Sequence, residues 1–230
     1  MSSRVDERPP GAPAEVVTCR KVSRPTDDGL PTVVGMTSND IPATYARRAA
    51  PFTAVVDRLP AAAWNAPSPC EGWTARDVLD HVMSSQRGFL AERGIALAST
   101  DADPTVASDP VAAWRQHDER VQQLLARPEV RDHAYDGVLG TTTVGRSLVD
   151  FNGFDLLVHR WDVAAAAGLD ERFTDGELDV VEQSVAGFGD HLYDEGVCRP
   201  GVSPTQGADR QERVLARLGR RVPVPDGVRG

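Results

Sequence analysis

The chain has 230 residues, 40% of them hydrophobic, which suits one soluble domain with room for a sizeable core. Its formal net charge of -9 argues against nucleic acid and anionic membranes as partners, because both require clustered lysine and arginine. No apolar run approaches the roughly 18 to 20 residues that span a bilayer, and three cysteines without CxxC spacing indicate neither a disulfide framework nor a thiolate zinc site, so we expect a reducing cytoplasm.

Residues 1–35 differ in composition from the rest of the chain. Five prolines interrupt a polar stretch that has no helical or strand period, which is typical of a disordered arm. The charged start is not followed by the apolar segment of a secretory signal. Met36 opens the first regular segment and is a candidate translation start. We therefore expect a single folded domain over 36–230.

Helical periodicity begins at Ile41. Apolar residues at helical spacing predict long helices over about 42–59, 75–96, 110–127, 144–167 and 175–193, and a short amphipathic helix within 208–220. Thr74 and Asp77 resemble a capping box, and Gly168 is a typical helix end. The segment 136–145 reads as a connection, and no pattern requires a strand. The sequence thus predicts an all-α fold, a four-helix bundle with additional C-terminal helices.

The histidines differ in their surroundings. His81 lies midway along the second predicted helix among apolar neighbours, so it is a candidate metal ligand. His117 and His133 have charged neighbours and are expected to be exposed to solvent. His191, near the end of the fifth helix, would complement the helix dipole. For His81 alone, the alternative is a core histidine hydrogen-bonded to a carbonyl or to Asp77.

A carboxylate and an imidazole stand four residues apart in the fourth long helix. Asp155 and His159 therefore share one helix face. Burying such a pair is unfavourable unless each member finds a partner, and a divalent metal satisfies both. Asn152 and Asp162 extend this polar stripe and are candidates to orient the ligands from behind. The alternatives are a capped or salt-bridged pair, and surface or cap contacts for the outer two residues.

Two segments together resemble a known family. PSPCEGWTARDVLDHV at 67–82, followed by DLLVHRWDVAAAAG at 155–168, is similar to the mycothiol-dependent maleylpyruvate isomerase N-terminal family of the DinB-like superfamily. The resemblance runs from about Met36 to the C-terminal RVLARLGRRVP. It implies a DinB-like four-helix bundle whose metal, usually zinc, is held by His81, Asp155 and His159. The isomerases carry Glu where this chain has the shorter Asp155, so this carboxylate would approach the metal differently or bind through water.

The resemblance also implies a chemistry. In the isomerases and related thiol transferases a low-molecular-weight thiol such as mycothiol binds the metal as a thiolate and attacks an electrophilic carbon of a small substrate. The chain would then be a thiol-dependent transferase or isomerase, in which catalytic residues beyond the ligands are unknown. The alternatives are a metal-dependent hydrolase that uses metal-bound water and a non-catalytic metal-binding protein with a structural metal.

Two tryptophans and a cysteine lie close to these motifs. Trp73 and Trp161 are candidates for the wall of a substrate pocket, although large aromatic side chains beside helix faces more often belong to the core. Cys70 reads as part of a rigid connection that delivers the second helix. It would be a nucleophile only beside a helix start or a metal.

Overall fold

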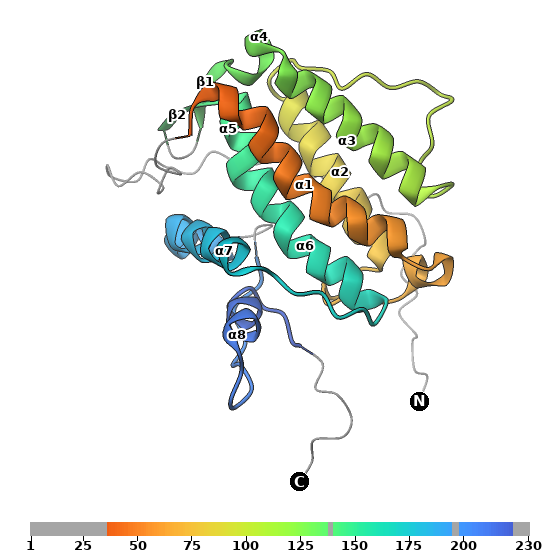
Figure 1. Cartoon of the computed structure of the whole chain (residues 1–230), viewed down its shortest axis with the longest axis vertical. Helices are drawn as coiled ribbons and strands as arrows, with labels where there is room; N and C mark the ends of the chain where they lie inside the picture. The colour runs from red at the N-terminus through yellow and green to blue at the C-terminus, as the bar shows by residue number, and fades with distance from the viewer. Residues whose placement is uncertain (1–35, 138–139, 195–197, 223–230) are drawn as a thin grey trace, which may run out of the picture.

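The computed structural model describes residues 36–137, 140–194 and 198–222. Its centre is a bundle of four long helical segments, namely α1 (Ile41–Arg58), α2 (Ala75–Ala91), α3 (Pro110–Ala126) and a fourth that runs from α5 (Val144–Ser147) into α6 (Gly153–Ala166). Both α1 and α2 contact α3 and α6, so each segment packs between two others (Figure 1). The predicted all-α bundle is confirmed. The predicted disordered arm, 1–35, lies outside the described residues.

Shorter elements surround the bundle. Single 3-10 turns occupy Ser38–Asp40 and Ala61–Asn65, and a short helix α4 (Pro128–Arg131) leads into an antiparallel hairpin of β1 (Ala134–Gly137) and β2 (Gly140–Thr143). Beyond α6, helix α7 (Asp175–Phe188), a 3-10 turn (Gly189–Tyr193) and α8 (Arg210–Arg217) form a layer beside the bundle (Figure 1). Within the described ranges, no helix has the length and apolar character that crossing a membrane requires.

The helix starts follow the capping signals of the sequence. Thr74 accepts a hydrogen bond from the N–H of Asp77, whose carboxylate accepts the Thr74 N–H at 2.8 Å, and α7 begins with the same arrangement. The end of α2 comes at Ala91, five residues before the predicted end. Gly94 has a φ of 70° and turns the chain away from the helix there. Helix starts were therefore easier to predict than this helix end.

A π-helical turn joins α5 to α6. It spans Leu148–Asn152, and the Gly153 N–H bonds to the carbonyl of Leu148, one residue farther back than in an α-helix. From α1, the guanidinium of Arg48 donates to the carbonyl of Val149 and lies where a Cβ on Gly153 would be. Turns of this kind are frequent at functional sites. This one directly precedes the helix that carries the predicted ligands.

Gly145 in α5 is expected to tolerate no side chain. A Cβ there would stand 2.9 Å from the carbonyl oxygen of Arg131 and 3.0 Å from a methyl of Ile41. Because backbone cannot yield as a flexible side chain does, Gly145→Ala is expected to lower the free energy of unfolding by about 1–3 kcal/mol, measured by urea denaturation. Gly88→Ala in α2 is the control, since a Cβ there meets nothing within 4 Å. Equal stability of the two variants would contradict the prediction.

His117 is buried, and the prediction that it would be exposed is wrong. Its side chain is 1% exposed, and its Nε2 lies 2.8 Å from Oε1 of Gln86 on α2. The charged neighbours that suggested exposure occupy other faces of α3, while Ala113 and Val121, four residues before and after, are in the core with His117. His133, in contrast, is exposed as predicted.

The buried His117 should make stability depend on pH. Burial, aided by Arg87 and Arg120, lowers its pKa from 6.5 to about 3. Between pH 6.5 and about pH 3, His117 is therefore protonated in the unfolded chain but not in the folded chain. Because protonation then favours the unfolded state, the free energy of unfolding falls as the pH is lowered through this window. The slope from this one group is at most about 1.4 kcal/mol per pH unit. Burial raises the pKa of Asp118, whose contribution has the opposite sign.

The measurement compares wild type with His117→Gln. Urea denaturation at pH 7 and pH 4 should show that wild type loses more stability on acidification than the variant does. The difference between the two proteins isolates His117 from Asp118 and the other carboxyl groups. His133→Gln should behave like wild type. A His117→Gln protein with the full wild-type pH dependence would refute the assignment.

Candidate metal centre

Two of the predicted ligands face each other across the bundle. His81 lies on α2 and His159 on α6, and their ring centroids are 5.2 Å apart in an edge-to-face arrangement. The indole of Trp73, which precedes α2, also lies beside His81, with the ring centroids 4.9 Å apart. The rings come together because α2 and α6 are adjacent in the bundle and each histidine is on the face directed at the other helix. This juxtaposition joins the two sequence motifs.

Asp162 fixes the orientation of His159. Its Oδ2 lies 2.9 Å from Nδ1 of the imidazole, one turn back along the same helix, and its side chain is fully buried. A carboxylate at Nδ1 leaves Nε2 as the ring nitrogen available to a metal, which is the usual arrangement behind metal-binding histidines. Asp162 thus contacts the histidine that it was predicted to orient. Asn152 is buried at the π turn, and within the described residues its side chain makes no hydrogen bond to this group.

Asp155 lies one turn before His159 and is partly buried. Burial raises the pKa of its carboxyl group, while the charges of His159 and Arg220 oppose this. Within the described part of the chain, no side chain or backbone N–H donates to the Asp155 carboxylate, and the ring nitrogens of His81 are likewise without a hydrogen bond. Burial lowers the pKa of His81 to about 4, with His159 and Arg220 adding to the effect. The imidazoles of His81 and His159 and the Asp155 carboxylate are ligand types that suit a divalent metal, but within the described residues their ligand atoms do not all lie within 4.8 Å of one another.

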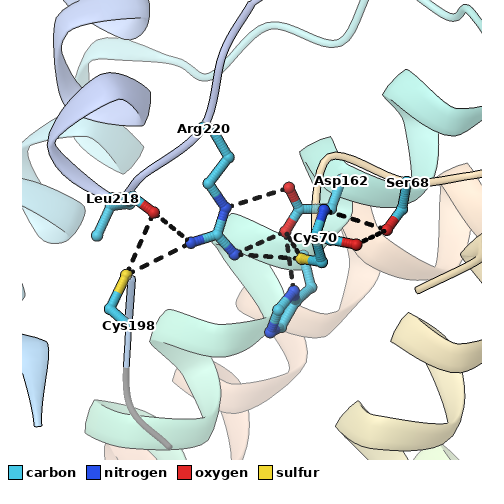
Figure 2. A network of polar contacts seen from close by, with 7 residues as sticks. Ser68, Cys70, Asp162, Cys198, Leu218 and Arg220 are labelled. Atoms are coloured by element: carbon cyan, nitrogen blue, oxygen red, sulfur yellow. Dashed lines mark hydrogen bonds and ion pairs between the residues drawn. The ribbon is translucent and has the colours of Figure 1, made fainter. Parts of the chain in front are cut away.

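A second set of possible ligand groups surrounds His159. Ligand atoms of Cys70, His159 and Asp162 all lie within 4.8 Å of one another. Cys70 precedes α2, and its Sγ donates to Oδ2 of Asp162 at 3.3 Å (Figure 2). Sequence reasoning placed Cys70 in a connection and did not bring it to the site. The rigid connection does hold the thiol, because the Cys70 N–H donates to the hydroxyl of Ser68 at 3.2 Å.

Arg220, from the segment after α8, closes this side of the site. Its Nη2 and Nε donate to the two oxygens of Asp162 at 2.8 and 3.2 Å, and Nη2 lies 3.6 Å from Sγ of Cys70 (Figure 2). Its Nη1 lies 3.5 Å from Sγ of Cys198 and donates to the carbonyl of Leu218. Sequence reasoning missed Arg220, because nothing near it in the chain distinguishes it from the arginines that lie on the surface.

The charges of the buried groups balance one another. Burial alone would raise the pKa of Asp162, but Arg220 and the hydrogen bond from His159 hold it well below its usual value. Burial alone would lower the pKa of His159, but Asp162 and Cys70 raise it. Burial disfavours the charged form of Arg220 as well, and the Asp162 carboxylate reverses this. Asp162 is therefore ionised, and Arg220 is its permanent counter-ion.

Trp161 does not line this site in the same way as Trp73. Its side chain is buried among apolar residues of α6, α7 and α8, in a cluster that includes Phe154, Val181 and Leu215. That cluster holds the C-terminal layer on the bundle. Trp73 is about one-third exposed and touches His81, so of the two tryptophans it is the one beside a predicted ligand.

A protein-family model matches the part of the chain that contains these motifs. Residues 45–164, just over half of the chain, match the family model described as the mycothiol maleylpyruvate isomerase N-terminal domain. The chain belongs to this family. The matched part of this mycothiol maleylpyruvate isomerase family member contains Cys70 and all three predicted ligands. Arg220 lies outside it, so one contact of the site comes from the C-terminal segment.

Two curated relatives of this family member are described as uncharacterized proteins. The uncharacterized proteins Rv0738 and MT0763, from the H37Rv and CDC 1551 strains of Mycobacterium tuberculosis, are each 27% identical to it over 118 residues. The alignment covers 51% of this chain and 62% of each relative, so less than two thirds of the relatives' length is matched. No solved structure gives a significant match.

Proposed function

We propose that the chain binds zinc through His81, Asp155 and His159 and uses it in a thiol-dependent transfer or isomerisation. Membership of the mycothiol maleylpyruvate isomerase family connects the chain with metal and with mycothiol. The observation that carries the proposal is the placement of two imidazoles on α2 and α6 with centroids 5.2 Å apart, and of a partly buried carboxylate one turn from His159 that makes no hydrogen bond within the described residues. Such a donor set leaves zinc an open position.

The contacts of Asp162 favour this set over Cys70, His159 and Asp162. Both oxygens of Asp162 already accept hydrogen bonds from Arg220, and one also contacts Nδ1 of His159. A dication at that point would replace these bonds and stand beside a guanidinium, which is unfavourable in a buried site. Nε2 of His159 makes no contact with Asp162, so a metal could bind there once the ring gives up the proton that its raised pKa favours, and the ring nitrogens of His81 have no hydrogen bond to break. Asp162 and Arg220 then orient His159 and neutralise each other.

In this proposal, zinc activates the thiol and the surrounding side chains hold and shield the metal. When bound, zinc lowers the pKa of a thiol and makes it a nucleophile at neutral pH. His81, Asp155 and His159 would hold the metal and carry no proton. Asp162 would hold the His159 ring by its Nδ1 hydrogen bond, and Trp73 would shield one face of His81 from water. The substrate would be a small molecule with an electrophilic carbon, approached from the side that the three donors leave open.

The test uses the full chain loaded with cobalt(II) in place of zinc. Addition of mycothiol, or of cysteine as a surrogate thiol, should change the visible cobalt spectrum, whereas serine, which has a hydroxyl in place of the thiol, should not. An unchanged spectrum would overturn the thiol chemistry. If the zinc-loaded chain hydrolyses substrates equally well without thiol, the site is that of a metal-dependent hydrolase. Zinc bound with neither response would indicate a structural metal.

A further inference from the structure

A second group of buried polar side chains lies in the interior of the bundle. Tyr45 of α1, Gln86 of α2, and His117 and Asp118 of α3 are 0, 0, 1 and 8% exposed. The hydroxyl of Tyr45 donates to Oε1 of Gln86 at 3.3 Å, and Nε2 of His117 lies 2.8 Å from the same oxygen. Three of the four bundle segments therefore meet at one amide. None of these residues belongs to the metal centre.

Three buried atoms of this cluster have no partner among the described residues, namely Nε2 of Gln86, Nδ1 of His117 and Oδ1 of Asp118. Buried polar atoms in folded proteins almost always have a hydrogen-bond partner, so three in one cluster indicate something further. The other oxygen of Asp118 accepts from Gln122 at 2.8 Å, and the Tyr45 hydroxyl lies close to the same carboxylate. Three of the six buried side-chain atoms without a partner in the described residues thus belong to this one cluster, and the other three belong to separate arginines.

The hydrogen bonds already present determine whether each unpartnered atom requires a donor or an acceptor. Oε1 of Gln86 can only accept, so Nε2 of His117 carries the proton of the neutral ring and Nδ1 is an acceptor. Oδ1 of Asp118 also requires a donor, while Nε2 of Gln86 requires an acceptor. His117 and Asp118 cannot satisfy each other, because neighbouring residues on a helix point about 100° apart. A partner common to Gln86 and either of the other two side chains would therefore have to both donate and accept.

Rotating the amide of Gln86 does not remove the deficit. Its Nε2 would then face Nε2 of His117, which would have to give up its proton to Nδ1. That exchange leaves an unpartnered Nδ1–H and an unpartnered Oε1 in place of the earlier atoms. A cation would meet the amide N–H groups of Gln86, and an anion would meet the carboxylate of Asp118. Water can donate two hydrogen bonds and accept two, and so has the chemistry that each of these atoms requires.

We propose that this cluster is a buried water site, in which ordered water donates to His117 and Asp118 and accepts from Gln86. Bound water would link α1, α2 and α3 through a single hydrogen-bonded network. Such a network favours one packing of the three helices, because any shift along a helix axis would break it. The site is independent of the metal centre and of the proposed thiol chemistry.

A crystal structure of the full chain that resolves ordered solvent is the direct test. The expected result is at least one water within 2.7–3.2 Å of two or more of the three atoms. The nitrogen-15 spectrum of His117 gives an independent reading without mutation, and should show Nε2 protonated and Nδ1 accepting a hydrogen bond. A structure with no solvent there, and the three atoms paired with protein groups, would overturn the proposal.

Water relaxation dispersion in solution adds a variant test. The paired substitution Gln86→Met with His117→Phe removes the polar atoms of the amide and of the ring and replaces them with apolar side chains of similar shape and somewhat larger volume. It should remove the contribution of at least one long-lived water, and His133→Phe, at an exposed histidine, should not. If the paired variant does not fold, the crystal structure and the His117 spectrum of wild type still decide the question. An unchanged dispersion in a folded paired variant would refute the site.

Discussion

His159→Ala is expected to abolish tight zinc binding by the purified full chain. The substitution removes the central donor of the proposed set, the ring that lies 5.2 Å from His81 and one turn from Asp155. Loss of a group behind a ligand typically lowers metal affinity about 10–100-fold, so loss of the ligand itself should exceed 100-fold. Metal analysis after dialysis, and competition with a coloured chelator, measure the effect. His81→Ala should show the same loss.

Two further variants separate the competing donor sets. Cys70→Ser should retain zinc if the ligands are His81, Asp155 and His159, but should lose it if the metal lies among Cys70, His159 and Asp162. His133→Ala removes an exposed histidine and should retain zinc in either case. Near-stoichiometric zinc in both His159→Ala and His81→Ala would reject the proposed site. Asp155→Asn then tests whether that carboxylate binds directly, since an amide is a weaker ligand for zinc.

The fold was predictable to the extent that local patterns determine it. Each long helix combines a stripe of apolar residues with a recognisable cap, as Thr74 shows at the start of α2. The hairpin of β1 and β2 was not predicted, because its four-residue strands have burial patterns too short to show a period of two. The π turn was not predicted either. It depends on Arg48, about one hundred residues away, which bonds to the Val149 carbonyl.

The candidate site was predictable where its residues lie within one helix. Asp155, His159 and Asp162 follow helical spacing, and His81 stands out as a histidine among apolar neighbours. Cys70 and Arg220 reach Asp162 across separations of 92 and 58 residues, and their contacts depend on how the helices and the C-terminal segment pack. The error at His117 has a different cause. Its neighbours in sequence are charged, whereas the residues four positions away on its own face are apolar and buried.

Arg220→Met is expected to lower the free energy of unfolding by about 3–5 kcal/mol. The side chain of Asp162 is fully buried, and Arg220 is the cation that donates to both of its oxygens. Without Arg220, the carboxylate keeps the contacts from Cys70 and from His159, whose raised pKa makes the ring a cation in the metal-free chain, but it loses two hydrogen bonds and its permanent counter-ion. Urea denaturation of the metal-free full chain measures the loss without a contribution from metal binding.

A second substitution distinguishes lost charge pairing from lost packing. Asp162→Asn in the Arg220→Met background removes the unpaired charge while an amide oxygen still accepts from Nδ1 of His159. If unpaired charge causes the loss, the double variant should be more stable than Arg220→Met alone. Arg221→Met, at the exposed neighbouring residue, should unfold like wild type. Should Arg220→Met instead match Arg221→Met, the C-terminal segment would not hold Asp162 in solution, and the orientation of His159 would rest on Asp162 and Cys70 alone.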